Sequence, residues 1–367
     1  MVAIAFYTIP AIVSIETRKR RDSMRGAKVA KIALDDFGAF LSRKEGCLVI
    51  KDREGNTERY PLGENEIGEI QVRSGNAVSV GAMVSCAFWG IDVIVLTSRG
   101  NPVAVLHSFD NDSHVLTRVY QYETLKTVKC LEIAKQFVLG KIRGQDQLLR
   151  KYGLRRNDYA VIEAVSKLEA SSLPMLQRQL NTIEGQCANR YFQQLFGLLP
   201  EFLRPKNRTT FKAYDRTNNL FNLGYTVLSW KVHIGLIKAK LEPYLGFLHS
   251  LQYGKPSLVC DFEELYRYLI DDFVIQYALS LKEKDFILKE ESFSSNRKGK
   301  RQYLNGAKNG EFLKRLNLYF ISKIDIPRIK VGKKQEIETL INEEALLFAK
   351  YLRGETPTWH PRIAALA

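Results

Sequence analysis

Short apolar runs bounded by turn residues characterise the chain between residues 31 and 106. The runs lie at residues 39–41, 47–50, 70–72 and 91–96, and segments rich in Gly, Asn, Asp and Ser separate them. Runs of this length between turn residues are typical of β-strands. Small and apolar residues over 79–89 predict one helix that crosses between strands. The pattern therefore predicts a small, mostly-β N-terminal domain over residues 27–109.

Beyond residue 110 the apolar positions recur every three to four residues, as on one face of an α-helix. This period predicts helices at residues 128–138, 176–191, 225–241 and 339–352, with Pro243 ending the third. Residues 294–300, SSNRKGK, predict a mobile basic loop. The second half is expected to form a larger all-α domain over residues 114–361, joined through a linker near 109–113. The predicted fold class is two-domain α+β.

The charge balance points to a polyanionic partner. Lys and Arg number 55 against 40 Asp and Glu, a net charge of +15. We expect nucleic acid, since no long basic amphipathic helix is present to lie on a membrane surface. Charge runs are usually solvated surface, but the net excess and the interleaved aromatics favour a DNA-binding face. The candidate DNA-binding residues are Arg204, Lys206, Arg208, Lys212, Arg216, Arg297, Lys298, Lys300 and Arg301.

The cysteines and the N-terminal segment indicate the cellular compartment and where the fold begins. The five cysteines are dispersed and form no Cys-x-x-Cys pair, so we expect a reducing cytoplasm and no zinc site built from cysteines. In the first 26 residues an apolar run precedes the basic cluster at 18–21, the reverse of a secretory signal. We expect residues 1–26 to lie outside the fold, with Met24 as the hypothetical native start.

A candidate catalytic centre lies around residues 241–267. His249 precedes a loop, and Asp261 and Glu264 follow at a spacing that places both carboxylates on one helix face. A histidine and carboxylates that converge can hold a divalent metal. Two other interpretations remain open here: a core histidine with a satisfied ring, and a capping box with Asp261 as N-cap and Glu264 at N3.

A second candidate carboxylate is Glu184, on the predicted helix at 176–191. Gly185 follows it and Ala188 lies one turn later, which leaves room for a large ligand to approach. The alternative is a solvated glutamate, the usual situation of a charged helix residue. The sequence holds no Gly-x-Ser-x-Gly, no Walker loop and no glycine-rich dinucleotide motif that would indicate a competing chemistry.

Five segments, taken together, resemble the CRISPR-associated protein one family, the spacer-integrating endonuclease of CRISPR adaptation. They are VSVGAMVSCAFWGIDVIVLTSRGNPVA in the first half, EGQCANRYF from Glu184, DRTNNLFNLGYTVL from Asp215, LEPYLGFLH up to His249, and YGKPSLVCDFEELYR around Asp261 and Glu264. The resemblance covers nearly all of residues 27–361, and the combination of motifs is specific although no single motif is.

The resemblance implies a β-sandwich-like N-terminal domain, a helical catalytic domain, a homodimer, and a partner, the small CRISPR-associated protein two. It implies that Glu184, His249 and Glu264 ligate a metal, with Asp261 as the accompanying catalytic acid. Many relatives carry Asp where this chain has Glu264. One nitrogen among oxygen ligands suits Mn²⁺ and permits Mg²⁺.

The resemblance also matches Asp215, Asn218 and Asn222 to a helix-start motif with a structural or DNA-positioning role. Arg216 stands where relatives often have proline, so this helix lacks a pre-organised first turn.

The implied activity is insertion of short foreign DNA into a CRISPR array. A 3′-hydroxyl of a DNA duplex attacks a phosphodiester at the edge of a repeat, and water attacking instead gives nuclease activity. Two other classes stay open at this point: a stand-alone nuclease acting on branched repair DNA, and a non-catalytic DNA-binding scaffold.

Overall fold

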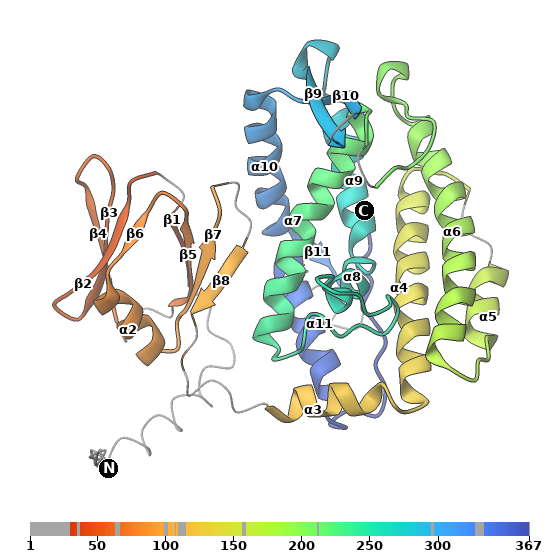
Figure 1. The fold of residues 1–367 in the computed structure, drawn as a ribbon, viewed down its shortest axis with the longest axis horizontal. Helices are drawn as coiled ribbons and strands as arrows, with labels where there is room; N and C mark the ends of the chain where they lie inside the picture. The colour runs from red at the N-terminus through yellow and green to blue at the C-terminus, as the bar shows by residue number, and fades with distance from the viewer. Residues whose placement is uncertain are drawn as a thin grey trace. The chain divides into compact units, whose positions relative to one another are not determined.

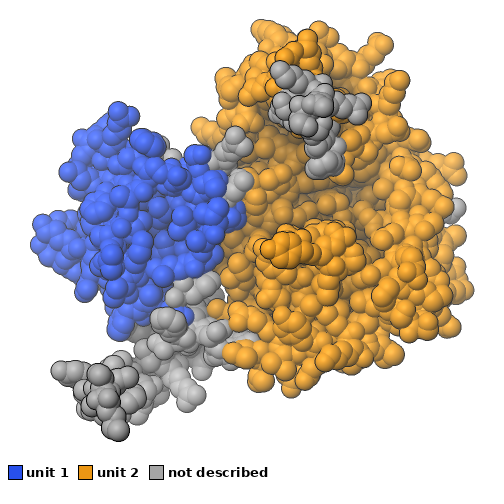
Figure 2. Space-filling view, viewed as in Figure 1, with its two compact units in different colours: residues 1–113 blue, residues 114–367 orange. Residues whose placement is uncertain are grey.

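The computed structural model describes residues 30–34, 37–62, 67–98, 102–106, 108, 115–155, 159–210, 213–294, 297–326 and 334–366. The predicted extension at 1–26, the predicted linker at 109–113 and Lys212 lie outside these residues, as do the side chains of Arg297 and Lys298. The chain divides into two compact units, Met1–Ser113 and His114–Ala367 (Figure 2).

The described part of the first unit forms two four-stranded sheets (Figure 1). One has the order β1-β5-β7-β8, with β8 antiparallel to its neighbour and the others parallel. The other has the order β4-β3-β2-β6. The strands are β1 (Ala30–Leu34), β2 (Phe40–Lys44), β3 (Cys47–Lys51), β4 (Thr57–Pro61), β5 (Ile67–Arg73), β6 (Ala77–Val78), β7 (Asp92–Leu96) and β8 (Pro102–Leu106).

The two sheets of this unit share a core with a helix. Helix α2 (Val80–Phe88) begins where predicted, because the side chain of Ser79 accepts a hydrogen bond from the backbone N–H of Ala82. Leu41 of β2 and Ile70 of β5 are both fully buried in the same apolar cluster as Ala82. The predicted mostly-β character of this half is confirmed.

The second unit is mainly helical, as predicted (Figure 1). Among the described residues, every helix is too short or too polar to cross a lipid bilayer. Its α-helices are α3 (Val115–Thr124), α4 (Lys129–Lys151), α5 (Tyr159–Lys167), α6 (Leu173–Gly197), α7 (Arg216–Lys238), α8 (Ser257–Glu263), α9 (Arg267–Ala278), α10 (Gly306–Phe320) and α11 (Ile337–Leu352), with 3-10 turns at Glu201–Leu203 and Glu283–Asp285.

The prediction that this unit is all-α is wrong. Strands β9 (Phe286–Ser294) and β10 (Arg297–Leu304) form an antiparallel hairpin, and β11 (Lys323–Asp325) pairs with β12 (Lys334–Glu336). Most of the segment predicted as a mobile basic loop therefore lies in two strands. The sequence pattern did not predict β9 and β10, because charged residues occur on both faces of these strands. The alternation of apolar and polar residues that marks a half-buried strand is therefore missing.

The hairpin packs at the beginning of α7 (Figure 1). The backbone N–H of Gln302 donates to the carbonyl of Tyr214 at 3.1 Å, and its own carbonyl accepts from the side chain of Asn219 at 2.8 Å. Helix α7 itself begins at Arg216, nine residues before the predicted start at Tyr225. Asp215 caps it by accepting from the N–H of Asn218 at 2.7 Å.

Two close approaches place α4 against the segment that carries the candidate site. A Cβ at Gly140 would lie 2.5 Å from a methyl carbon of Leu265, and one at Gly144 would lie 2.5 Å from the ring of Tyr268. A larger residue at either position would force these side chains to shift, and Lys141 lies between the two glycines on α4. Phe262 of α8 also packs against α4: it is fully buried, and its ring contacts that of Phe137 with centroids 5.3 Å apart.

Candidate active site

The loop before α8 is organised around one buried carboxylate. Asp261 is completely buried in α8. Its Oδ2 accepts from the backbone N–H of Phe247 at 2.6 Å and of Leu248 at 3.0 Å, and its Oδ1 accepts from the backbone N–H of His249 at 2.8 Å. Three successive N–H groups therefore converge on one side chain, which fixes the loop that carries His249.

Asp261 also orients the ring of His249, whose Nδ1 lies 2.8 Å from Oδ1. A carboxylate only accepts hydrogen bonds, so Nδ1 carries the proton and Nε2 of the neutral ring keeps a free lone pair. Burial favours the neutral ring. The hydrogen bond to Asp261 and the charges of Asp261 and Glu264 outweigh it, so the pKa of His249 lies above its usual value.

The capping-box interpretation is wrong. Helix α8 begins after Pro256, so Asp261 lies inside the helix and Glu264 stands at its C-terminal end. Asp261 instead holds the preceding loop, and Glu264 forms ion pairs. An Asp-x-x-Glu pair has the same local spacing in a capping box and inside a helix, so the spacing alone could not separate the two. The backbone N–H groups that bind Asp261 lie 12 to 14 residues away in the chain.

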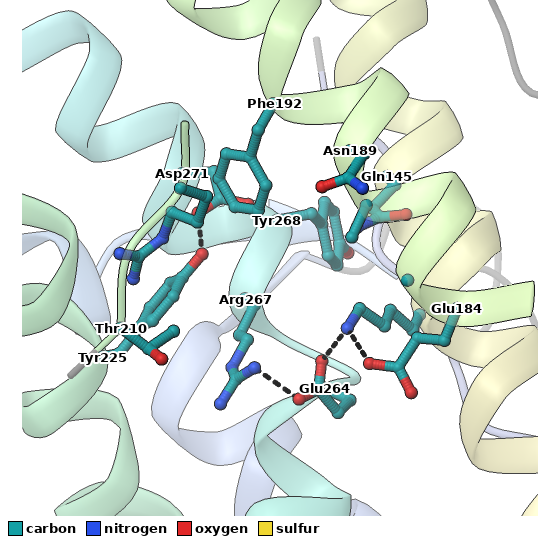
Figure 3. Close-up of a pocket in the computed structure, with 14 residues that line it drawn as sticks. Gln145, Glu184, Asn189, Phe192, Thr210, Tyr225, Glu264, Arg267, Tyr268 and Asp271 are labelled. Carbon is teal, nitrogen blue, oxygen red and sulfur yellow. Dashed lines mark hydrogen bonds and ion pairs between the residues drawn. The ribbon is translucent and has the colours of Figure 1, made fainter. Parts of the chain in front are cut away.

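A lysine joins the two candidate glutamates. The Nζ of Lys141, on α4, lies 2.7 Å from Oε2 of Glu264 and donates a hydrogen bond to Oε1 of Glu184, on α6. Figure 3 shows Glu184 and Glu264 turned toward the same point, with these ion pairs as dashed lines. The Glu184 side chain is thus partly buried and ion-paired, contrary to the solvated glutamate considered from the sequence. Segments 80 residues apart in the chain meet here.

Arg267 completes the charge balance on the other side of Glu264 (Figure 3). Its Nη1 pairs with Oε1 of Glu264, and its Nη2 donates to Glu263 at 3.1 Å. Burial opposes ionisation of Glu264, but the charges of Arg267 and Lys141 prevail and hold its pKa well below the usual range. The pKa of Lys141 is raised, because attraction to Glu264 and Glu184 outweighs the effect of burial. Glu264 is therefore a carboxylate and Lys141 an ammonium.

A pocket of about 290 Å³ opens beside this cluster. Glu184 lies at one end and Asp271 and Tyr225 at the other (Figure 3), and Gly185, next to Glu184 in the chain, also lines the pocket. Nothing lies within 4 Å of a Cβ built on Gly185, so the space next to Glu184 is open, as the small residues predicted. The pocket gives a bound molecule direct access to both glutamates.

The far end of the pocket holds a buried acid. Asp271 accepts hydrogen bonds from the hydroxyls of Tyr191 at 2.7 Å and Tyr225 at 2.5 Å. Complete burial raises the pKa of Asp271 to about 6, although these hydrogen bonds and nearby arginines oppose the rise. This residue is a neighbour of the site and makes no described contact with Glu184 or Glu264.

Sequence reasoning missed Lys141, Arg267 and Asp271. For two of them a signal existed: Arg267 and Asp271 follow Glu264 at three and seven residues, which places all three on one helical face. No local signal marks Lys141, because its partners lie 43 and 123 residues later in the chain.

The residues present suit a divalent cation, although no group of three or more His, Cys, Asp or Glu side chains in the described ranges stands in a ready metal-holding arrangement. Glu184 and Glu264 already share a cation, the ammonium of Lys141. His249 lies near enough for its charge and that of Glu264 to influence each other. Two carboxylates and an imidazole nitrogen are a donor set for Mn²⁺ or Mg²⁺.

Those predicted DNA-binding residues whose side chains the structure describes fall into two groups. Lys206 and Lys300 are exposed, the latter 3.7 Å from Glu290. The other described candidates are arginines whose guanidiniums are engaged within the fold. Arg204 donates to the carbonyl of Leu199, Arg208 to Asn218 and Asn222, Arg216 to the carbonyl of Phe202, and Arg301 to the hydroxyl of Tyr303.

Arg208 has the most extensive packing of this set. Its guanidinium lies over the rings of Phe192, Phe221 and Tyr225, with distances to the ring centroids of 5.2 to 5.6 Å. It also lines the pocket. Asn218 and Asn222, part of the predicted helix-start motif, accept its hydrogen bonds at 2.9 and 2.7 Å. The motif therefore anchors Arg208 at the edge of the pocket.

Solved structures with a similar fold come from several systems. A "Casposase bound to integration product" aligns with a TM-score of 0.67 at 20% identity, covering 91% of this chain and 93% of that one. A CAS1 protein from Thermotoga maritima gives 0.65 at 21% identity, covering 89% and 97%. A "Partial Cas6-RT-Cas1--Cas2 complex" gives 0.68 at 19% identity, covering 93% and 100%. These likenesses establish the fold.

Sequence comparison establishes the family. The model of the family described as "CRISPR associated protein Cas1" matches residues 32–309. The chain is 30% identical over 344 residues to "CRISPR-associated endonuclease Cas1 3" of Thermus thermophilus, covering 92% of this chain and 98% of the relative. It is 31% identical over 259 residues to "CRISPR-associated endonuclease Cas1 1" of Pyrobaculum aerophilum, covering 67% and 81%. The chain therefore belongs to the CRISPR-associated Cas1 family, whose relatives in this comparison are named endonucleases.

Proposed function

We propose that this protein joins short DNA duplexes to a CRISPR repeat by transesterification at phosphorus, with Glu184, His249 and Glu264 holding Mg²⁺ or Mn²⁺. The observation that carries the proposal is the convergence of Glu184 and Glu264 on one cation beside an open pocket. Membership of a family whose relatives are named endonucleases supports it.

Each residue of the cluster has a role that follows from its contacts. His249 offers Nε2 because Asp261 binds Nδ1, so Asp261 is a positioning residue. Arg267 keeps Glu264 ionised from the side opposite Lys141. The bound cation would supply polarisation of the phosphate and stabilisation of charge on the leaving oxygen. The pocket beside Glu184 is the space through which the attacked phosphodiester would reach this cluster.

We propose that DNA lies across the basic residues of the second unit. Lys206 and Lys300 supply exposed charge that can reach phosphates. Arg208, held over three aromatic rings at the edge of the pocket, is a fixed cation next to the reacting centre. Arg204, Arg216 and Arg301, together with Lys212, Arg297 and Lys298, extend this proposed surface.

We propose that the working assembly is a homodimer of this chain with the small CRISPR-associated protein two. One solved structure of similar fold is a Cas1–Cas2 complex and another is a casposase bound to its integration product. The excess of positive charge suits an assembly that holds duplex DNA.

The test is a strand-joining assay. A short duplex with 3′-hydroxyl ends is incubated with Mn²⁺, the protein, its small partner and a plasmid carrying one repeat. We expect joined products from the wild type and none from Glu184→Gln, which retains DNA binding. Glu169→Gln, which alters an exposed glutamate just before α6, serves as the matched control and joins normally. Full joining by Glu184→Gln would refute the proposed centre.

Two substrates separate the remaining classes. A duplex whose 3′ ends lack the hydroxyl should give no joined product, because the nucleophile is missing. Cleavage of branched DNA that needs neither the repeat nor the small partner would identify a stand-alone nuclease instead. Binding of DNA without joining or cleavage of either substrate would identify a scaffold.

A further inference from the structure

Lys141 stands where two proposed metal ligands meet. Its ammonium contacts Glu264 Oε2 at 2.7 Å and hydrogen-bonds Glu184 Oε1. Only 9% of its side chain is exposed, against 18% for Glu184 and 1% for Glu264. A cation this buried between two carboxylates interacts with both at low screening.

The close packing of α4 places Lys141 next to Glu264. Gly140 and Gly144 permit the close approach of α4 to Leu265 and Tyr268, which follow Glu264 in sequence. Lys141 therefore reaches Glu264 from a helix that is held at short range. The long side chain of lysine can withdraw by rotation about its own bonds, without movement of the helix.

One oxygen of Glu264 is the point at which the ammonium of Lys141 and a metal ion would compete. Oε2 of Glu264 is buried and lies 2.7 Å from the ammonium of Lys141, its described partner. Divalent cations such as Mg²⁺ bind carboxylate oxygens, so one would compete with the ammonium of Lys141 for this position.

We propose that Lys141 is a tethered cation that holds Glu184 and Glu264 together in the metal-free protein and must be displaced when a divalent ion binds. The proposal rests on the proposed function, since it takes both glutamates as metal ligands. The apparent metal affinity is then lowered by the fraction of molecules in which Lys141 occupies the site. The same ammonium keeps two carboxylates from repelling each other until the metal arrives.

The experiment measures Mn²⁺ binding, from the free-ion signal in electron paramagnetic resonance, in the full-length protein without DNA. Lys141→Met keeps the aliphatic stem and removes the charge, and we expect it to bind Mn²⁺ at least about tenfold more tightly than the wild type. A lysine that only supported the fold would give unchanged or weaker binding when removed. The control is Lys135→Met on the same helix, whose lysine bonds to the carbonyl of Ser166, and its Mn²⁺ affinity should equal that of the wild type.

A second measurement uses the wild type, so that it decides the matter if Lys141→Met does not fold. Amine acetylation followed by mass spectrometry reports how freely each lysine reacts. Saturating Mn²⁺ should raise the acetylation rate of Lys141 severalfold, because the ammonium loses both carboxylates, and should leave Lys135 unchanged. An unchanged rate at Lys141 with Mn²⁺ bound overturns the proposal.

Glu184→Gln separates a failure of the proposed metal centre from a failure of the proposed displacement of Lys141. If Mn²⁺ binds the wild type and this variant equally, the proposed metal centre fails and the role of Lys141 fails with it. If Glu184→Gln loses Mn²⁺ while Lys141→Met binds as the wild type does, the metal centre stands and only the displacement of Lys141 is refuted.

Discussion

Oδ1 of Asp261 accepts two hydrogen bonds from the same residue, one from the backbone N–H of His249 and one from its ring Nδ1, each at 2.8 Å. The carboxylate thus sets both the position of the loop and the tautomer of the ring. A residue held at two points cannot rotate its imidazole without losing one of them. The orientation of Nε2 is therefore decided by a residue in a different element.

Asp261→Asn should weaken Mn²⁺ binding about 10- to 100-fold, because partners that fix a ligating histidine typically have effects of this size. Electron paramagnetic resonance measures the change. In a His249→Ala background the same substitution should have little further effect on affinity, since the ring it orients is absent. Equal losses in both backgrounds would show that Asp261 acts independently of His249.

Mn²⁺ affinity should fall as pH is lowered, and the fall should begin above pH 6.5, because a ligating imidazole must be neutral and the pKa of His249 is raised. The stability of the metal-free protein should change in the opposite direction and rise as pH is lowered. In the metal-free protein the charged pair with Asp261 contributes stability that is complete below the unfolded pKa and is lost as pH rises through the raised one. Affinity measured from pH 5.5 to 8 checks the first effect, with His249→Ala as the control that lacks this step.

Gly246→Ala should destabilise the loop that carries His249. An added Cβ would lie 2.7 Å from the carbonyl carbon of Ser257 and 2.8 Å from Oδ2 of Asp261, and neither backbone nor buried carboxylate can move easily. We expect a loss of about 1–3 kcal/mol in the free energy of unfolding. In Gly185→Ala the new methyl meets nothing within 4 Å, and alanine favours a helix interior, so unfolding should cost up to about 1 kcal/mol more. Urea denaturation compares the two.

The buried acid at the far end of the pocket should make stability depend on pH. The pKa of Asp271 is about 6 in the fold, against 3.8 as its ordinary value, so the folded state binds the extra proton between these limits. Its contribution is complete below the lower value and is lost as pH rises through the higher one. Relative to Asp271→Asn, the wild type should gain about 1 kcal/mol from pH 7.5 to pH 5. If the free energies of unfolding of the two proteins, measured by denaturation, changed equally over this pH range, Asp271 would not be a buried acid that titrates there.

Lys206→Gln should reduce DNA affinity similarly for all sequences and lower the slope of log K against log salt concentration by about 0.9, the value for one phosphate contact. Lys206 is exposed, so the fold should be unaffected. Lys167→Gln removes an exposed lysine of α5 that pairs with Glu163, and it is expected to leave the slope unchanged. Identical slopes for wild type and Lys206→Gln would remove Lys206 from the proposed DNA surface.

Local pattern predicted much of the fold. The strand runs, the helix after Ser79 and the long helices around residues 128–138 and 176–191 follow from periodicity, because each depends on neighbours within a few turns. The hairpin β9–β10 escaped this reasoning. Its charged residues hide the alternation of a half-buried strand, although its two strands pair with each other along their length. Tyr214 and Asn219, from a distant part of the chain, then hold its second strand against the start of α7.

By itself the sequence determined which chemical groups are available: Glu184, His249, Asp261 and Glu264, in a chain of net positive charge. Only the tertiary structure decided what they do to one another. Asp261 became the anchor of the His249 loop instead of a helix cap, and Lys141 came to lie between the two glutamates. Such relationships join residues 12 to 123 positions apart. They depend on how α4, α6 and α8 pack, and no local period in the chain encodes that packing.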